Sequence, residues 1–222
     1  MATRGGPKTA EAIRQAAIDS FFLHGYEATT LRDLAGEVGV KVGSLYNHIS
    51  SKEELLFSIM SEVLRDLQAE LDRALEGWTA PSERLRVAIE CHIAFHAHRA
   101  KEVFIGNSEL RSLAPDRRAV IIELRDAYEH QVRTIVEEGQ ASGEFYYPEP
   151  RLATFAIVAI GTHVSSWYRP DGSLSLAEVA SAYADLLLRA MHNPEVQVAP
   201  GDVLAAVEAD NAPDAPEAAP AG

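Results

Sequence analysis

The stretch from Thr30 to Lys52, TLRDLAGEVGVKVGSLYNHISSK, constrains the fold more than any other part of the chain. Its first half places apolar side chains at i, i+3, i+4 and i+7, the spacing of one helix face: Leu31, Leu34, Ala35 and Val38. Thr30 is suited to cap this helix, with Asp33 as an acidic variant of the capping box. Gly39 follows, where a tight turn needs a residue that tolerates positive φ. The segment therefore predicts a helix that ends in a sharp turn.

A second helix is predicted after the turn, up to residue 49, and its two faces differ. Val42, Leu45 and Ile49 point inward at helical spacing. The other face carries small, polar and aromatic side chains, which suit close approach to phosphates and base edges. We therefore predict a DNA-reading unit over residues 30–49, with an ordinary helical hairpin as the alternative. The predicted DNA-binding residues are Thr30, Lys41, Gly43, Ser44, Tyr46, Asn47, His48 and Lys52.

The segment GSLYNHISSKEELL resembles the motif of the TetR family of bacterial transcriptional repressors, roughly G-x-L-Y-x-H-F-x-x-K-x-x-L. The matching positions are Gly43, Leu45, Tyr46, His48, Lys52 and Leu55, and Ile49 replaces the usual Phe. The upstream FFLHGYEATTLRDLA resembles the family's first helix and the start of its second. The resemblance covers about residues 8–68. It implies a helix-turn-helix domain, double-stranded operator DNA as a partner, and a homodimer that a small ligand regulates.

The charge of the chain suits a DNA-binding protein once it is divided. The whole chain has 20 Lys and Arg against 33 Asp and Glu, a net charge of −13. Residues 1–52 alone carry six basic and five acidic side chains, so the acidic excess lies in the remainder. Only the first part is then suited to meet phosphate, while an acidic body repels DNA. Weak attraction per domain favours two copies on one site.

Helical periodicity continues along the chain, and no run of residues is typical of a strand. We therefore predict an all-α protein of about nine helices. A helix-turn-helix domain of three helices is expected over residues 8–68, and a larger ligand-binding and dimerisation domain over residues 69–192. Ser51 and Glu54 are predicted to form a capping box for a long helix that joins the two domains. Residues 193–222 are rich in Pro, Ala and acidic side chains and are predicted to be a disordered tail.

The cysteine count and the missing motifs narrow the class of protein. Cys91 is the only cysteine, so an internal disulfide is excluded and a reducing cytoplasm fits. No apolar run is typical of a secretory signal or a membrane span, so we expect a cytoplasmic protein with no membrane partner. No Ser-His-Asp order, Gly-rich phosphate loop or HExxH motif is present, so neither an enzyme nor a cofactor is expected. A helical interaction protein that does not bind DNA stays an alternative.

Two segments near the end of the second domain are suited to a subunit interface. Residues 152–167 are apolar nearly all round and carry small residues that let helices approach closely: Ala156, Ala159, Gly161, Thr162, Ser165 and Ser166. Residues 176–191 place one apolar stripe at helical spacing: Val179, Tyr183, Leu186, Leu187 and Ala190. Members of the TetR family dimerise through their last two helices. We therefore predict a homodimer joined through residues 152–191, with simple core packing as the alternative.

Two histidines lie on an otherwise apolar helix face within residues 81–98. His92 and His96 continue the stripe that begins at Leu85. They fit three hypotheses: satisfied core histidines, polar groups in a mostly apolar pocket, or a metal sensor in which the pair shares an ion. No metal ligand is assigned, because Cys91 points away from His92 and no acidic residue completes a set. The predicted ligand-binding residues are His92, Phe95, His96, Tyr128 and His163.

The stretch SSWYRPDGSLS around Trp167 resembles actinobacterial TetR-family repressors of lipid and sterol breakdown, several of which respond to acyl-coenzyme A thioesters. It is also suited to a structural helix end. The resemblance implies a small apolar effector that releases the operator, with an acyl-coenzyme A thioester as one candidate. Nearby basic residues are candidate phosphate ligands or solvated helix ends: Arg99, Lys101, Arg111, Arg117 and Arg118.

Overall fold

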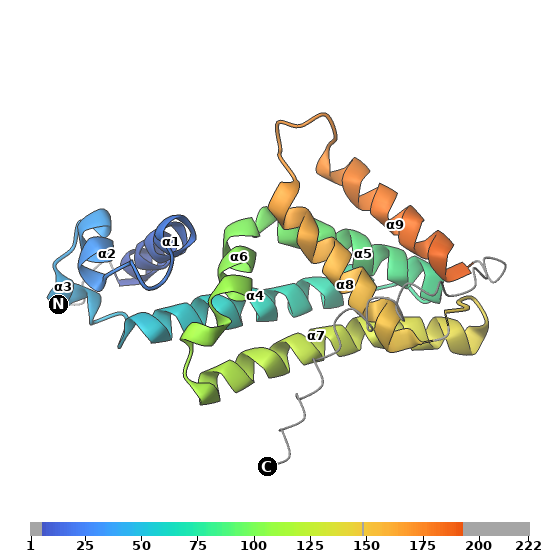
Figure 1. Cartoon of the computed structure of the whole chain (residues 1–222), viewed down its shortest axis with the longest axis horizontal. Coiled ribbons are helices and arrows are strands. Elements are labelled where there is room, and N and C mark those ends of the chain that lie inside the picture. The colour runs from blue at the N-terminus through green and yellow to red at the C-terminus, as the bar shows by residue number, and fades with distance from the viewer. Residues whose placement is uncertain (1–5, 148, 193–222) are drawn as a thin grey trace, which may run out of the picture. The chain divides into compact units, whose positions relative to one another are not determined.

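The computed structural model describes residues 6–147 and 149–192. Within these residues the chain forms nine α-helices and one 3₁₀ turn and contains no strand, so the all-α prediction is confirmed (Figure 1). The helices are α1 Gly6–His24, α2 Leu31–Val38, α3 Val42–Leu45, α4 Lys52–Leu75, α5 Pro81–His98, α6 Ala100–Ser108, α7 Pro115–Ser142, α8 Pro150–Trp167 and α9 Leu176–His192. No described helix combines the length and apolar content that a membrane crossing requires. The predicted tail, residues 193–222, lies outside the described residues.

Helix ends fall close to the predicted positions, with one correction. Ser51 caps α4, since its hydroxyl accepts from the Glu54 N–H at 3.0 Å. The Glu54 carboxylate, however, accepts from the Ser50 N–H at 2.8 Å, so the predicted reciprocal bond to Ser51 is wrong. The 3₁₀ turn η1, Leu110–Ser112, lies between the end of α6 at Ser108 and the start of α7.

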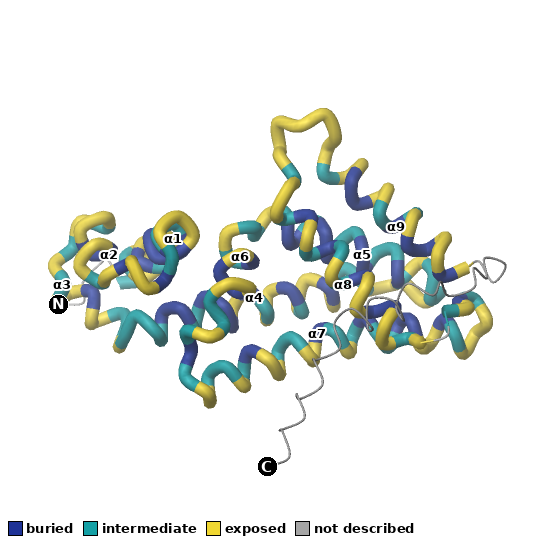
Figure 2. Tube along the Cα trace, in the orientation of Figure 1, coloured by how far each residue is buried: buried dark blue, intermediate teal, exposed yellow. Residues whose placement is uncertain are grey.

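Two clusters of buried apolar side chains form the interior, and α4 contributes to both. The first joins α1, α2 and α3 to the start of α4 and to Ile105 of α6, Leu113 and Ile121 of α7. Phe21, Leu45 and Ile59 are fully buried in it. The second joins the rest of α4 to α5, α7, α8 and α9. Figure 2 shows buried positions recurring along α4. The change from one cluster to the other falls between Met60 and Val63, inside a continuous helix. The domain limits at 8–68 and 69–192 stay predictions.

Candidate DNA-binding surface and ligand cavity

Local hydrogen bonds fix the start of α2 and its end. The Thr30 hydroxyl accepts from the Asp33 N–H at 3.2 Å, and the Asp33 carboxylate accepts from the Thr30 N–H at 3.1 Å, which confirms the predicted capping box. The Thr30 hydroxyl also donates to this carboxylate at 2.6 Å, and these bonds lower the pKa of Asp33. Gly39 ends the helix in the left-handed region, at φ 74°. The N–H of Val40 donates to the Ala35 carbonyl at 2.9 Å, so the backbone itself fixes the turn toward α3.

The face of α3 that carries Leu45 is buried, and the opposite face is exposed. The regular helix is short and continues in turns to Ile49, whose N–H donates to the Leu45 carbonyl at 3.2 Å. The predicted DNA-binding positions on this segment are exposed or, for His48, half-buried: Lys41, Gly43, Ser44, Tyr46, Asn47 and His48. Tyr46 is 55 % exposed, and a Cβ added at Gly43 meets no atom within 4 Å. Packing within the chain therefore requires neither residue.

Lys52 has a different environment from the other predicted DNA-binding residues. Its ammonium donates to the carbonyls of Tyr26 at 2.8 Å and Thr29 at 2.9 Å, and it lies 4.2 Å from the centroid of the Tyr26 ring. These carbonyls belong to the connection between α1 and α2, whereas Lys52 is the first residue of α4. Lys52 therefore ties the long helix to the DNA-reading unit. Its contact with DNA stays a prediction.

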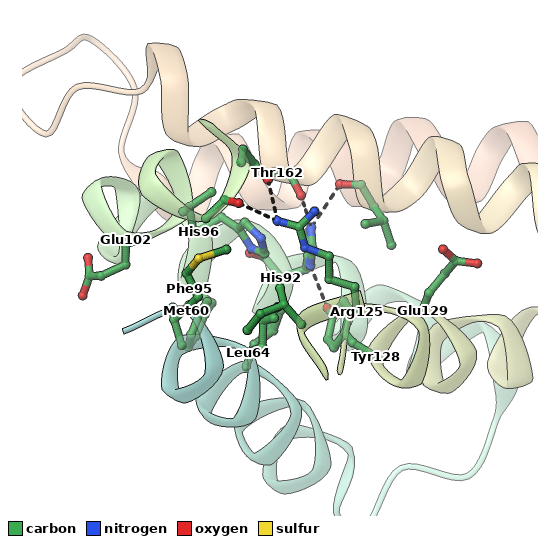
Figure 3. A pocket seen from close by; sticks show the side chains of 17 residues that line it. Met60, Leu64, His92, Phe95, His96, Glu102, Arg125, Tyr128, Glu129 and Thr162 are labelled. Carbon is green, nitrogen blue, oxygen red and sulfur yellow. Dashed lines mark hydrogen bonds between the residues drawn. The ribbon is translucent and has the colours of Figure 1, made fainter. Parts of the chain in front are cut away.

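A cavity of about 250 Å³ lies among α4, α5, α6, α7 and α8 (Figure 3). Its apolar wall comes chiefly from α4 and the helices that face it: Met60, Val63, Leu64, Leu67, Phe95, Val103 and Ile121. Its polar wall comes from α5 to α8: His92, His96, Glu102, Asn107, Arg125, Tyr128, Glu129 and Thr162. Four of the five predicted ligand-binding residues thus line one cavity: His92, Phe95, His96 and Tyr128.

The two histidines of this cavity form a hydrogen-bonded pair. His92 Nε2 donates to the Val158 carbonyl at 3.1 Å, since a carbonyl only accepts, and His92 Nδ1 therefore accepts from the Tyr128 hydroxyl at 2.7 Å. His96 Nδ1 donates to the His92 carbonyl at 2.8 Å. Burial lowers the pKa of His92 well below its usual value and the pKa of His96 to about 4, so both rings are neutral near pH 7. The pair combines two of the hypotheses, because it is satisfied in the interior and also lines a pocket.

This bonding suits the histidine pair poorly to sharing a metal ion. Both nitrogens of His92 have partners, and His96 offers only Nε2. Burial raises the pKa of the Cys91 thiol to about 11, which disfavours the thiolate that a metal would need. Within residues 6–147 and 149–192, no three His, Cys, Asp or Glu side chains gather as metal ligands would. The bonding of the two histidines therefore counts against the metal-sensing alternative.

His163 does not join the other predicted ligand-binding residues. It is exposed on α8 and lines a second hollow, of about 850 Å³, formed by α6, α8 and the segment after α8. The two hollows adjoin, because Val103, Asn107 and Thr162 line both. Arg169 brings a positive charge to the second hollow.

The predicted basic cluster is mostly engaged with carboxylates. Arg99 lies 2.6 Å from Glu102, and Arg117 lies 3.8 Å from Glu53. Lys101, which also lines the second hollow, pairs with Asp19 of α1. These pairs favour the interpretation of Arg99, Lys101 and Arg117 as residues that join neighbouring helices.

The last two helices each have one buried face and one exposed apolar face. Gly161 is buried, and a Cβ added there would lie 2.3 Å from the His92 ring, so this glycine serves packing within the subunit and its assignment to the interface is wrong. Val179 and Leu187 of the predicted stripe are also buried. Several large apolar residues of this region are exposed instead: Leu152, Phe155, Trp167, Leu174 and Leu186. The homodimer stays a prediction.

Sequence reasoning missed Arg125, and it assigned Thr162 to a different surface. Arg125 precedes Tyr128 by three residues on α7, so the two side chains share a helix face. Because Tyr128 was predicted to line the cavity, Arg125 could have been predicted to line it as well. The contribution of α4 had no such signal, because Leu64 and Leu67 look alike in sequence whether they face a core or a cavity.

A helix-turn-helix with a free reading face, joined by one long helix to a cavity-bearing helical domain, defines a DNA-binding transcriptional regulator. The family model "Tetracyclin repressor-like, C-terminal domain" matches residues 79–191, and the model "Bacterial regulatory proteins, tetR family" matches residues 13–59. This chain therefore belongs to the TetR family of transcriptional regulators. It is not an enzyme, because its family and its relatives are regulators.

Individual regulators are similar to this chain over most of its length. The repressor KstR2 of Mycolicibacterium smegmatis is 29 % identical over 80 % of this chain and 88 % of its own length. The structure of a tetR-family regulatory protein from Rhodococcus RHA1 superimposes with a TM-score of 0.79, at 31 % identity, over 85 % of this chain and 99 % of that one. The structure of AibR with isovaleryl coenzyme A and operator DNA gives a TM-score of 0.74, at 25 % identity, over 81 % and 98 % of the two chains.

Proposed function

We propose that this protein is a dimeric repressor that a small apolar effector releases from its operator. The observation that supports this mechanism best is the position of α4. Four of its residues line the cavity, Met60, Val63, Leu64 and Leu67, and its first residue, Lys52, holds the connection between α1 and α2. An effector empties the operator only if it binds the DNA-free arrangement better, and a difference of about 1–3 kcal/mol is typical of such coupling. Binding to two half-sites requires the reading helices of the two subunits to lie about one turn of DNA apart, roughly 34–36 Å. A shift of α4 would change this distance.

The DNA contact is assigned to the exposed face of α3 and its flanks. Gly43 leaves room for a close backbone approach, and Tyr46, Asn47 and Lys41 present aromatic, amide and ammonium groups to the groove and the phosphates. Because operator DNA is the partner, the proposed place of action is the cytoplasm.

An acyl-coenzyme A thioester is the effector class that fits the two hollows best. The cavity of about 250 Å³ accommodates an acyl group but not a whole coenzyme A thioester. The adjoining hollow of about 850 Å³ offers Arg169 to the phosphates of the coenzyme, whereas Lys101 at the same hollow is paired with Asp19. AibR, a relative of similar fold, was solved with isovaleryl coenzyme A and operator DNA.

A mobility-shift titration tests the proposal. The protein is bound to the DNA upstream of its own gene, and acyl-coenzyme A thioesters of several chain lengths are added beside a parallel series of divalent metals. We expect thioesters to release the DNA and metals to have no effect. If thioesters leave the complex intact far above physiological concentration, the proposal of an acyl-coenzyme A effector would be wrong. If Zn²⁺ and a chelator control DNA binding instead, the metal-sensing alternative would be supported.

The proposed dimer has its own test. Leu186 is 59 % exposed on α9 and lines neither hollow, so Leu186→Arg should give monomers without harming the core. The matched change Leu187→Arg strikes a buried side chain and should unfold the protein instead. Light scattering at micromolar concentration measures the mass, and a monomeric parent would contradict the dimer.

A further inference from the structure

Among the described residues, one cation on the polar wall of the cavity, Arg125, has no ionic partner. Six titratable side chains line the cavity: His92, His96, Glu102, Arg125, Tyr128 and Glu129. Glu102 lies 2.6 Å from Arg99, and Glu129 lies 3.9 Å from Arg133, so each carboxylate has an arginine from outside the cavity. No carboxylate of the described chain lies within 4.0 Å of the Arg125 guanidinium. The wall is therefore left with one uncompensated positive charge.

The remaining groups around Arg125 do not neutralise this charge. His92 and His96 are uncharged, because burial lowers the pKa of both. Figure 3 shows the carboxylates of Glu102 and Glu129 on opposite sides of the cavity, both directed away from Arg125. Burial also lowers the pKa of Arg125, as expected where a cation is partly desolvated without a counter-charge.

Arg125 keeps most of its hydrogen-bonding capacity free. Its Nη2 donates to the Gly106 carbonyl at 2.7 Å and lies 3.5 Å from the side-chain oxygen of Asn107. Among the described residues, Nε and Nη1 have no acceptor, although a guanidinium has five N–H donors in a fork that matches a carboxylate. The first of these bonds holds the end of α6 against α7, so the guanidinium is fixed in position before any ligand arrives.

The wall opposite Arg125 is hydrocarbon. Met60, Leu64 and Leu67 of α4 supply it, with Phe95 of α5. A ligand that fills this space meets an apolar surface along its body and a positive charge at one point. A purely apolar acyl chain would leave the guanidinium desolvated and unpaired, which is costly.

We propose that the part of the effector that lies in the cavity carries a carboxylate and that Arg125 binds it. The proposal deepens the function proposed above, because it concerns the ligand of the same cavity. Two sources offer this chemistry: a coenzyme A thioester whose acyl chain ends in a second carboxylate, and a free carboxylic acid. The structure thus assigns Arg125 as a specificity-determining residue for an oxygenated, acid-terminated molecule over a plain acyl chain.

Isothermal titration of the full chain, without DNA, separates these ligands. The probes are adipoyl-coenzyme A and hexanoyl-coenzyme A, which have six-carbon chains with and without a terminal carboxylate, beside free adipate and free hexanoate. We expect the parent to bind adipoyl-coenzyme A roughly tenfold to hundredfold more tightly than hexanoyl-coenzyme A, the worth of a charge-assisted pair. If only the free acids bind, and do so through Arg125, the buried carboxylate is supported with the free acid as its source.

Variants of Arg125 decide whether the residue acts on the ligand or only on the fold. Arg125→Gln should remove the preference for the acid-terminated probe, and Arg125→Lys, which keeps the charge, should retain part of it. Arg118→Gln is the matched control, because Arg118 lies on the same helix and lines neither hollow. Thermal unfolding of the two Arg125 variants measures what the loss of the hydrogen bond to the Gly106 carbonyl costs in stability. Equal affinity of the parent for the two thioesters with no binding of free acids, an unchanged preference in Arg125→Gln, or no binding of any probe would overturn the proposal. Because no operator is present, failure of DNA release would leave this result standing.

Discussion

The DNA-reading unit and the cavity place their functional groups in opposite ways. On α3, Tyr46 is 55 % exposed and Gly43 faces open space, so the groups assigned to DNA contribute little to the fold. In the cavity, His92 and Tyr128 are buried and hydrogen-bonded to each other, so the groups assigned to the effector also hold the helices together. Function should therefore be separable from stability at the first site and inseparable from it at the second.

The largest effect is expected at the exposed site. Tyr46→Ala should weaken operator binding by about 2–6 kcal/mol for a dimer, since each lost base contact contributes about 1–3 kcal/mol. The free energy of unfolding should change by no more than about 0.5 kcal/mol, as is usual for exposed positions. Fluorescence anisotropy with labelled operator and urea unfolding measure the two quantities. A variant that binds operator as well as the parent would show that α3 is not the reading helix.

Acid should weaken the fold through the cavity. The pKa of His96 is about 4 in the folded protein against a usual 6.5, so between these values the unfolded chain binds a proton that the folded chain does not. The free energy of unfolding therefore rises with pH across this window. The contribution of His96 is complete above about pH 6.5 and is lost as the pH falls toward 4. At about 1.4 kcal/mol per pH unit, His96 alone accounts for about 3 kcal/mol, and His92 acts in the same direction. Urea unfolding at several pH values gives the free energy of unfolding as a function of pH. This free energy should depend less steeply on pH in His96→Gln than in the parent, and an identical pH dependence would rule out His96 as its source.

Removal of one hydroxyl from the cavity should cost less. Tyr128→Phe leaves His92 Nδ1 without its donor in a buried site, a loss of about 1–3 kcal/mol in the free energy of unfolding. Effector affinity should fall with it, because the same hydroxyl lines the cavity. Tyr146→Phe is the matched control, since Tyr146 is 59 % exposed. If the two variants were equally stable, the buried pair would contribute nothing to the fold.

Lys52 is the exception at the DNA end, and it sharpens the contrast. Its ammonium binds the carbonyls of Tyr26 and Thr29, so Lys52→Ala should lower the free energy of unfolding by about 1–2 kcal/mol as well as weaken DNA binding. Lys41→Ala, at an exposed position, should weaken DNA binding alone and reduce the salt slope by about one unit. Circular dichroism on heating distinguishes the two variants. Equal melting temperatures of Lys52→Ala and Lys41→Ala would show that Lys52 does not stabilise the fold.

The same contrast explains what could be predicted from the sequence. The capping box at Thr30, the turn at Gly39 and the exposed face around Tyr46 depend on residues a few positions apart, and local spacing was sufficient to predict them. The cavity depends on side chains from five helices, and spacing along one helix cannot tell whether Leu64 meets protein or empty space. Gly161 illustrates the limit, because a small residue suits a subunit interface and a buried histidine ring equally well. Arg125 shares a helix face with the predicted Tyr128, but its lack of a carboxylate partner can be recognised only when its neighbours in space are known.

The most direct test is the reciprocity of the two sites. If an effector in the cavity releases DNA through α4, then operator DNA must weaken effector binding by the same factor, typically 5–150-fold. The affinity of the most effective thioester should be measured by isothermal titration on the free protein and on the operator complex, beside the affinity of DNA with and without that thioester. We predict two equal factors, both well above one. Equal effector affinity in the presence and absence of operator would show that the cavity and the DNA-reading unit are not coupled.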